Sequence, residues 1–200
     1  MKRPAITFFL SIGAAATLAG QALSDVRRQF DAGQYQQVVA AARPDQDPRV
    51  MYLVAQSYQK LSRQDDARKA YEQLAARPDS DPWHGVGRSA AALLASDSQG
   101  ALDAANAAAA NGGSLPEAHY QRGLALSARQ DMAGAAAAFQ KAVDLDPDWS
   151  YAHYYAALAY AKAKRVDLAS THFQAFLRLA PNAPEKPEVQ SILRTLGARD

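Results

Sequence analysis

The sequence predicts an all-α protein, a stack of antiparallel helix pairs, and three observations support that prediction. First, residues 116–149 are followed by a similar stretch of the same length, residues 150–183. Ten of the 34 aligned positions are identical, whereas a chain this rich in alanine gives roughly three by chance. Second, the identities recur at helical spacing. Third, a proline, Pro147 or Pro181, closes each unit and stops a helix there.

Each unit divides into two helices that carry the same residue types at matching positions. A large residue, a small residue and an aromatic or aliphatic residue mark the first helix, and a small residue followed by an aromatic residue marks the second. Small residues let two helices approach closely, and aromatic rings fill the space between neighbouring hairpins. The recurring pairs are His119/His153, Gly123/Ala157, Leu126/Tyr160, Ala135/Ala169 and Phe139/Phe173.

This period and these residue classes resemble the tetratricopeptide repeat (TPR) family. The resemblance implies a TPR-like α-solenoid, in which antiparallel helix hairpins stack into a right-handed superhelix and a C-terminal helix caps the last repeat. The same template also fits the upstream sequence. Four repeats are therefore expected, at residues 48–80, 81–115, 116–149 and 150–183.

The repeat at 81–115 is the weakest of the four copies. Alignment places Trp83, Gly87 and Ala90 at the three marker positions of its first helix, and it makes the central turn, Ser96–Gly100, about two residues longer than in the other copies. The second helix is nearly all alanine and holds no aromatic residue. We therefore expect this helix to pack shallowly and to be the most mobile part of the stack.

At the two ends of the stack we expect a diverged helix hairpin, residues 25–47, and a capping helix with a tail, residues 184–200. Apolar residues at helical spacing predict that the capping helix has one buried face. Two of them, Ile192 and Leu193, are expected to pack against the second helix of the last repeat. The full apolar face consists of Val189, Ile192, Leu193 and Leu196.

Residues 1–24 have the three-part pattern of a secretory signal peptide. Lys2 and Arg3 precede an apolar stretch, Ala5–Ala19, and small residues follow that suit cleavage after Ala22 or Ser24. The apolar stretch is shorter than the roughly 20 residues that span a bilayer, and cleavage is expected to remove it. No stable membrane span is therefore expected in the mature chain. The chain is therefore expected to be exported, to the periplasm, and its lack of cysteine fits export without disulfides.

Charge and motifs exclude several classes of function. Loss of Lys2 and Arg3 leaves 20 Lys and Arg against 20 Asp and Glu, and no basic stripe suggests nucleic-acid binding. Asp144, Asp146 and Asp148 resemble the opening of a calcium loop, but the twelfth position is Tyr155 and not a glutamate. The scattered histidines lack the spacing of a zinc site, and the sequence carries neither a nucleophile elbow nor a phosphate-binding loop. We therefore predict no catalytic residues, no metal site and no cofactor.

A partner-binding groove is the remaining candidate site. In the resembled superhelix the first helix of each repeat lines the concave face, which implies a groove with recurring aromatic residues. We expect its tyrosines to be partly exposed and to anchor a partner. Alternatively, they shield the helix beneath. The predicted groove residues are Tyr52, Gln56, His84, Arg88, Tyr120, Leu124, Tyr151, Tyr154 and Leu158.

The composition of this groove favours one kind of partner. TPR domains that clamp the C-terminal carboxylate of a chaperone need Lys, Arg and Asn, and the corresponding positions here hold Tyr52, Gln56, Gln121 and Tyr155. A peptide segment or helix of another cell-envelope protein fits better, which makes the chain an exported, non-enzymatic scaffold or adaptor. The alternatives are a self-assembling structural subunit, hence a homo-oligomer, and an enzyme whose site the sequence does not reveal.

Overall fold

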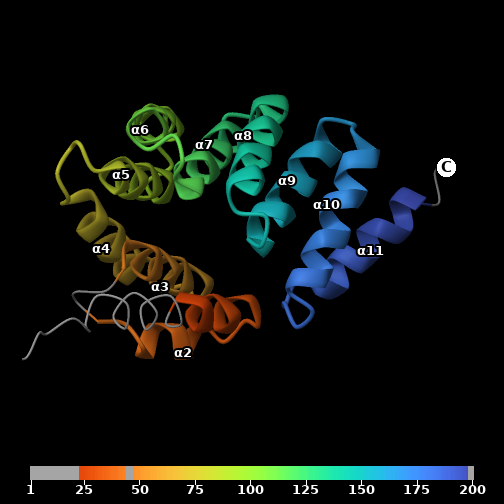
Figure 1. Cartoon of the computed structure of the whole chain (residues 1–200), viewed down its shortest axis with the longest axis horizontal. Helices are drawn as coiled ribbons and strands as arrows, with labels where there is room; N and C mark the ends of the chain where they lie inside the picture. Colours follow the sequence, from red (N-terminus) through yellow and green to blue (C-terminus); the bar gives the residue numbers. More distant parts are fainter. Residues whose placement is uncertain (1–22, 44–46, 198–200) are drawn as a thin grey trace, which may run out of the picture.

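The computed structural model describes residues 23–43 and 47–197, and these residues form a curved stack of helices (Figure 1). Residues 1–22 of the expected signal peptide lie outside the described residues. The described elements are helices joined by short turns, and consecutive helices pack as antiparallel pairs. This confirms the predicted all-α solenoid of helix hairpins.

The four repeats share one strict period of 34 residues. Their first helices, each of 13 residues, are α3 (Pro48–Lys60), α5 (Pro82–Leu94), α7 (Pro116–Ala128) and α9 (Ser150–Lys162). Their second helices are α4 (Gln64–Ala75), α6 (Ser98–Asn111), α8 (Met132–Leu145) and α10 (Val166–Leu179). A residue with positive φ turns the chain between the two helices of every repeat, at Ser62, Ser96, Gln130 and Lys164.

This period corrects the predicted alignment of the second repeat. Gly85, and not Trp83, is the counterpart of Met51, His119 and His153, because α5 starts 34 residues after α3 and 34 before α7. The predicted alignment was therefore wrong by two residues in α5. The central turn of this repeat is not longer than the others. The alignment failed because it placed Trp83, the largest side chain of α5, at the position that Gly85 occupies.

Side-chain caps and prolines begin several of the helices. Asp97 and Asp131 each accept a hydrogen bond from the backbone N–H three residues later, at 2.8 and 2.9 Å. Such caps satisfy backbone donors that the first helical turn leaves free. Pro116 occupies the first turn of α7, because that position needs no N–H donor.

Aromatic rings fill the interior of the last two repeats. Phe139 and Phe173 are fully buried, and the ring of Phe139 lies over Gly123, where an added Cβ would stand 2.6 Å from it. Tyr120 packs edge-on against Phe139 and tilted against Trp149. The small residue in each first helix thus makes room for the aromatic residue of the second.

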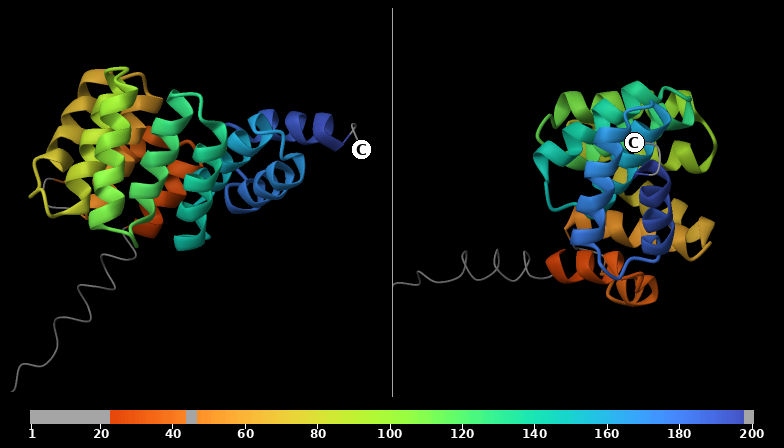
Figure 2. Two further views of the ribbon diagram at one scale, coloured as in Figure 1. Left: turned by 90° about the horizontal axis from the view of Figure 1, so that it is seen from above. Right: turned by 90° about the vertical axis from the view of Figure 1, so that its right-hand side faces the viewer.

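The N-terminal hairpin closes back onto the last repeat. It consists of helical residues 23–31, which we call the N-terminal helix, and α2 (Tyr35–Ala40). Arg27 pairs with Asp146 at 2.8 Å, and Ser150 donates a hydrogen bond to Asp31 at 2.6 Å. Figure 2 shows the hairpin beside the later repeats, with α11 at the far end of the stack. The stack is therefore curved tightly enough for its first hairpin to touch its fourth repeat.

Helix α11 (Lys186–Gly197) packs against α10 at the C-terminal end. Its buried residues are Val189, with no exposed surface, and Leu196, with 8% exposed. Ile192 and Leu193 pack against the core as expected, but both are only partly buried. The helix is rotated so that its first and last apolar residues meet the stack and the middle of its apolar face remains accessible.

Candidate functional site

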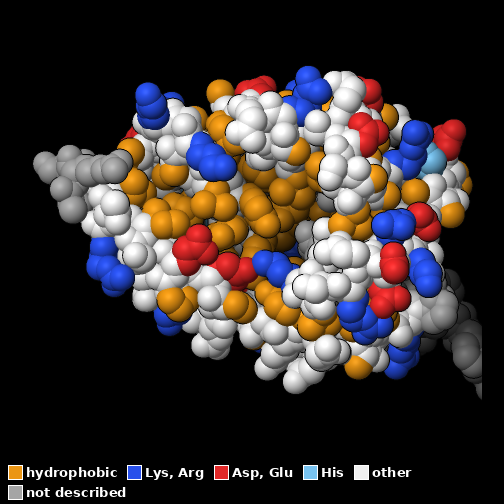
Figure 3. Space-filling view, turned by 180° about the vertical axis from the view of Figure 1, so that it is seen from behind, with side chains coloured by type: hydrophobic (Ala, Val, Ile, Leu, Met, Phe, Trp, Pro, Cys, Tyr) orange, Lys and Arg blue, Asp and Glu red, His pale blue; other side chains and the backbone are white. Residues whose placement is uncertain are grey.

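The concave face contains a hollow of about 420 Å³. All four first helices and the N-terminal helix contribute to it, so residues far apart in the sequence meet there. Figure 3, seen from the side opposite to Figure 1, shows a central hollow lined by hydrophobic side chains with charged side chains at its border. The lining residues are Phe30, Gln56, Gln59, Lys60, Leu93, Tyr120, Leu124, Tyr151 and Tyr155.

Four of the predicted groove residues line this hollow. Gln56 belongs to α3, Tyr120 and Leu124 to α7, and Tyr151 to α9. Leu158 is partly buried against the core and lies outside the lining. The structure thus brings the central part of the predicted set together and leaves the rest elsewhere.

The predicted partial exposure of the four tyrosines was wrong. Tyr52, Tyr120, Tyr151 and Tyr154 are at most 8% exposed. Their rings pack within the protein: Tyr52 against Tyr71 and Trp83, and Tyr154 against Phe173 and Phe176, for example. Most of these partners belong to the second helix of the same repeat, so the rings fill the interior of their own hairpins.

His84 and Arg88 do not reach the hollow. Nδ1 of His84 lies 3.1 Å from the carbonyl oxygen of Arg77, so its ring packs on the preceding turn. Arg88 is exposed outside the lining. The two-residue shift in α5 explains both results, because the α5 residue that lines the hollow is Leu93, the counterpart of Gln59 in α3.

Sequence reasoning missed Phe30, Lys60, Leu93 and Tyr155. The correct period would have found Leu93, and Lys60 lies one turn after Gln56, on the same face of α3. No pattern in the sequence indicated that Phe30 would line the hollow. Its ring reaches the hollow because the N-terminal helix meets α9, where the Phe30 and Tyr151 rings stand edge-on with centroids 5.2 Å apart.

Several polar groups in the hollow have no protein partner. Within the described residues, the hydroxyls of Tyr120 and Tyr155 and the side-chain amide of Gln56 make no hydrogen bond to another protein group. Burial raises the pKa of both tyrosines above the ordinary value of 10, so each phenol keeps its proton and remains a donor. Gln59 uses its Oε1 to accept a bond from Tyr71, which leaves its NH₂ group free.

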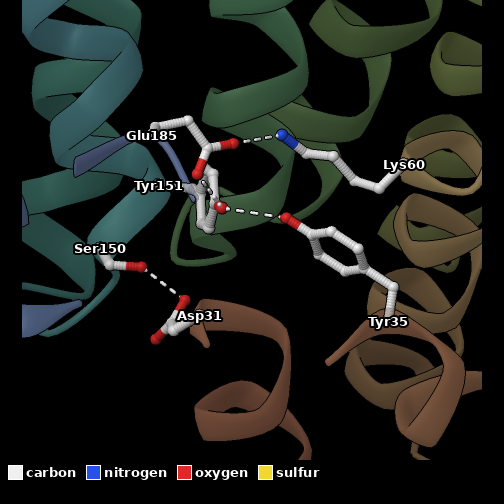
Figure 4. A network of polar contacts seen from close by, with 6 residues as sticks. All are labelled: Asp31, Tyr35, Lys60, Ser150, Tyr151 and Glu185. Carbon is white, nitrogen blue, oxygen red and sulfur yellow. Dashed lines mark hydrogen bonds and ion pairs between the residues drawn. The ribbon is translucent and has the colours of Figure 1, made fainter. Parts of the chain in front are cut away.

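A polar network includes two of the lining residues, Lys60 and Tyr151 (Figure 4). Lys60 donates to Glu185 at 2.6 Å, Tyr151 donates to the other oxygen of Glu185 at 2.8 Å, and the Tyr35 and Tyr151 hydroxyls are 3.4 Å apart. The Lys60 ammonium also lies over the Tyr151 ring, 5.1 Å from its centroid. The network joins α2, α3, α9 and the turn before α11.

The charges of this network cancel. Burial works to raise the pKa of Glu185, but the hydrogen bonds from Lys60 and Tyr151 outweigh it and lower that pKa. Burial works to lower the pKa of Lys60, and its bond to Glu185 overcomes this and raises it. Both groups are therefore ionised at neutral pH, and together they give the hollow no net charge.

The histidines anchor turns of the stack. Nε2 of His119 and Nε2 of His153 each lie about 3 Å from a carbonyl oxygen of the preceding turn, Gly113 and Pro147. Nδ1 of His153 lies 3.0 Å from Nδ1 of His172, and burial lowers the pKa of both, to about 4 for His172. The described residues contain no group of three or more acidic or histidine side chains that could hold a metal ion.

Comparison with known families agrees with the geometry. Models of the tetratricopeptide repeat match residues 49–80, 116–149 and 151–183. The chain contains tetratricopeptide repeats. None of the matching models describes a catalytic family, and no helix within the described residues has the length and apolar character needed to cross a membrane. A search of curated proteins finds no match.

Solved TPR structures share this fold at low sequence identity. A thermophilic TPR protein of Thermus thermophilus is 19% identical with a TM-score of 0.58, and the alignment covers 90% of this chain and 95% of that one. The first TPR of Spaghetti, bound to an HSP90 peptide, is 16% identical with a TM-score of 0.55, covering 62% and 98%. The TPR2B domain of yeast Sti1, in a complex with pHsp70, is 17% identical with a TM-score of 0.55, covering 60% and 98%. The likeness is one of fold.

Proposed function

We propose that this protein is an exported scaffold that holds a segment of another cell-envelope protein in its concave hollow. The observation that carries the proposal is the hollow itself, which is built by the first helices of all four repeats and presents polar groups without protein partners. The first TPR of Spaghetti is bound to an HSP90 peptide and the TPR2B domain of Sti1 is in a complex with pHsp70, and both support a role in binding a segment of another protein.

The bound segment differs from a chaperone terminus in its chemistry. A carboxylate clamp needs free basic groups, but Lys60 is already paired with Glu185. Gln121 is buried and donates to the Tyr52 hydroxyl at 2.6 Å, so it is unavailable to a ligand. We therefore assign the hollow to an internal segment of a partner.

Site-specific cross-linking tests this proposal. The chain has no cysteine, so a photoreactive maleimide can be attached at one introduced cysteine. Gln56→Cys places the probe in the hollow at a side chain that makes no hydrogen bond in the described part of the chain, and Lys141→Cys places it on the exposed surface of α8. In an envelope extract we expect one discrete adduct with the first variant and none with the second. Equal labelling at both positions would contradict the proposal.

Export itself is tested by the mass of the mature protein. Leu23 packs against the core, and a cut after Ala22 retains that contact, whereas a cut after Ser24 removes it. We expect the periplasmic fraction to contain a chain that begins at Leu23. A full-length chain that keeps Met1 would contradict export with cleavage.

Self-assembly is the second candidate function, and the surface of α11 favours it. Ile192 and Leu193 are only partly covered at the end of the stack, where another copy could add. Sedimentation velocity over a range of concentrations tests this candidate. Dimers that disappear in an Ile192→Glu variant would support it, and a monomer at every concentration would exclude it.

A further inference from the structure

The structure supports a narrower statement about what the hollow binds, which rests on the proposed function above. The starting point is that the hollow is a single site whose lining residues come from five helices. Phe30 forms part of its wall and packs against both Tyr35 and Tyr151, with ring centroids 5.3 and 5.2 Å away. The Tyr35–Tyr151–Glu185–Lys60 contacts lie beside this wall and hold two lining residues, Tyr151 and Lys60.

The size of the hollow matches a short occupant. A volume of about 420 Å³ lies near the lower end of the range of about 300–1,000 Å³ typical of small-ligand sites. It holds one large side chain with its flanking peptide groups. A whole helix would need the N-terminal helix to move away.

The charge of the hollow selects against ionised side chains. Lys60 is the charged residue of the lining, and Glu185 neutralises it at 2.6 Å. A second charge brought into the hollow would lose part of its hydration without gaining an unpaired charge as its partner, which is costly. The occupant is therefore uncharged.

The unpartnered polar groups define the rest of the occupant. Tyr120 is 98% buried, it lines the hollow, and its hydroxyl donates to no protein group among the described residues. Tyr155 presents a second free hydroxyl, and Gln59 presents an NH₂ group whose partner oxygen is already used by Tyr71. These groups are mainly donors, and the acceptors that a peptide offers are its backbone carbonyl oxygens.

We propose that the hollow binds one bulky uncharged side chain of a partner, such as Phe or Leu, and that Tyr120, Tyr155 and Gln59 hydrogen-bond the carbonyl oxygens on either side of it. The ring and leucine side chains of the wall contact the apolar group. The phenols and the amide orient the backbone. Recognition then depends on one anchor residue and not on a long sequence.

Capped tripeptides test this proposal on the full chain. The probes are acetyl-Gly-X-Gly-amide, with X as Phe, Leu, Ala, Glu or Lys, and binding is measured by calorimetry. We expect the Phe and Leu probes to bind at least about tenfold more tightly than the Ala, Glu and Lys probes, because only they fill the apolar pocket. Equal affinity for the Phe and Lys probes would overturn the proposal.

Two variants distinguish specific binding of the probes from nonspecific binding. Tyr155→Phe removes one hydroxyl and keeps the ring, and it should weaken the Phe probe about fivefold while leaving the melting temperature unchanged. Tyr58→Phe is the matched control, because the Tyr58 hydroxyl also makes no hydrogen bond within residues 23–43 and 47–197 but lies outside the hollow. Equal affinity of the Tyr155→Phe variant and the unmodified chain would refute the assigned hydrogen bond.

A third variant fills the space directly. Leu124→Trp should abolish binding of the Phe probe in a chain that circular dichroism shows to be folded. Tight binding that persists in this folded variant would place the ligand elsewhere. If the Gln56→Cys variant cross-links a partner but the tripeptides bind without preference for X, this inference fails while the proposed function stands. If the Gln56→Cys variant also gives no adduct, both fail.

Discussion

The second and third repeats have the same backbone and opposite interiors. In the third repeat, the Phe139 ring of α8 fills the space over Gly123 of α7. In the second, small residues pack directly against one another between α5 and α6: an added Cβ on Gly85 would stand 2.7 Å from the backbone oxygen of Ala104. The same 34-residue geometry thus contains an aromatic interior in one repeat and a small-residue interior in the other.

The largest expected effect is a loss of stability at one position that is equivalent in the two repeats. Phe139 in α8 and Ala105 in α6 are 34 residues apart and both fully buried. Phe139→Ala should lower the free energy of unfolding by about 3–5 kcal/mol, because it leaves a cavity under Tyr120 and Tyr155. Ala105→Gly should lower it by about 1 kcal/mol, the cost of glycine within a helix.

Urea unfolding of both variants measures the difference. Equal losses would mean that the rings of the third repeat contribute no more than the alanines of the second, which would contradict the comparison.

The start of the third repeat also carries a titratable group that the second lacks. Glu117 is 2% exposed, its Oε2 has no partner among the described residues, and burial raises its pKa to about 7. Its counterpart in α5 is Trp83. A carboxyl whose pKa is higher in the folded chain than in the unfolded chain favours folding when protonated, so stability should fall as the pH rises from about 4.5 to 7.

Replacement of this carboxyl by an amide isolates its contribution. In Glu117→Gln, the loss of stability between pH 5 and pH 8 should shrink by on the order of 3 kcal/mol, and the variant should be the more stable protein at pH 8. Chemical denaturation at the two pH values checks this. An unchanged pH dependence would show that the Glu117 carboxylate finds a partner in solution.

A smaller effect tests a close approach between the first and second repeats. A Cβ on Gly87 would stand 2.5 Å from the backbone nitrogen of Ala75 and 2.6 Å from the carbonyl oxygen of Tyr71. Backbone atoms cannot rotate away, so Gly87→Ala should force α4 and α5 apart and cost about 1–3 kcal/mol. Gly113→Ala is the control, because its nearest neighbour would be 3.7 Å away. Identical melting temperatures for the two variants would count against the tight seam.

Hydrogen exchange probes the smallest difference. The buried residues of α6 are alanines, whereas those of α8 include Phe139 and Val143. Fewer large contacts hold α6 closed, so residues 102–110 should exchange amide hydrogens faster than residues 133–145. Protection that is equal in the two helices would show that close backbone packing stabilises α6 as well as rings stabilise α8.

These two repeats also show which parts of the structure the sequence could predict. Helix pairs and the 34-residue period depend on local patterns, and they were predicted for the later repeats. The alignment failed in α5 because Gly85 occupies a position usually marked by a large residue. The pattern of residues within one helix does not reveal that a glycine replaces the usual large residue, because the replacement depends on how closely two helices approach.

The site was harder to predict because it depends on the curvature of the whole stack. Gln56 and Leu124 follow from their helical positions, and both line the hollow. The burial of Tyr52 and Tyr154 depends on neighbouring helices, and Phe30 enters the site through contacts over more than one hundred residues of sequence, as does the Ser150–Asp31 bond. A repeat pattern specifies each hairpin but not the angle between hairpins.

Methyl NMR of the full chain with acetyl-Gly-Phe-Gly-amide tests the central claim most directly. Leu93 and Leu124 line the hollow, whereas Leu158 and Leu193 lie outside it. The account predicts that added peptide shifts the methyl signals of Leu93 and Leu124 and gives contacts between them and the peptide ring, while Leu158 and Leu193 stay unchanged. Shifts centred on Leu193, with Leu93 and Leu124 unaffected, would place the binding surface on the C-terminal helix and contradict the account.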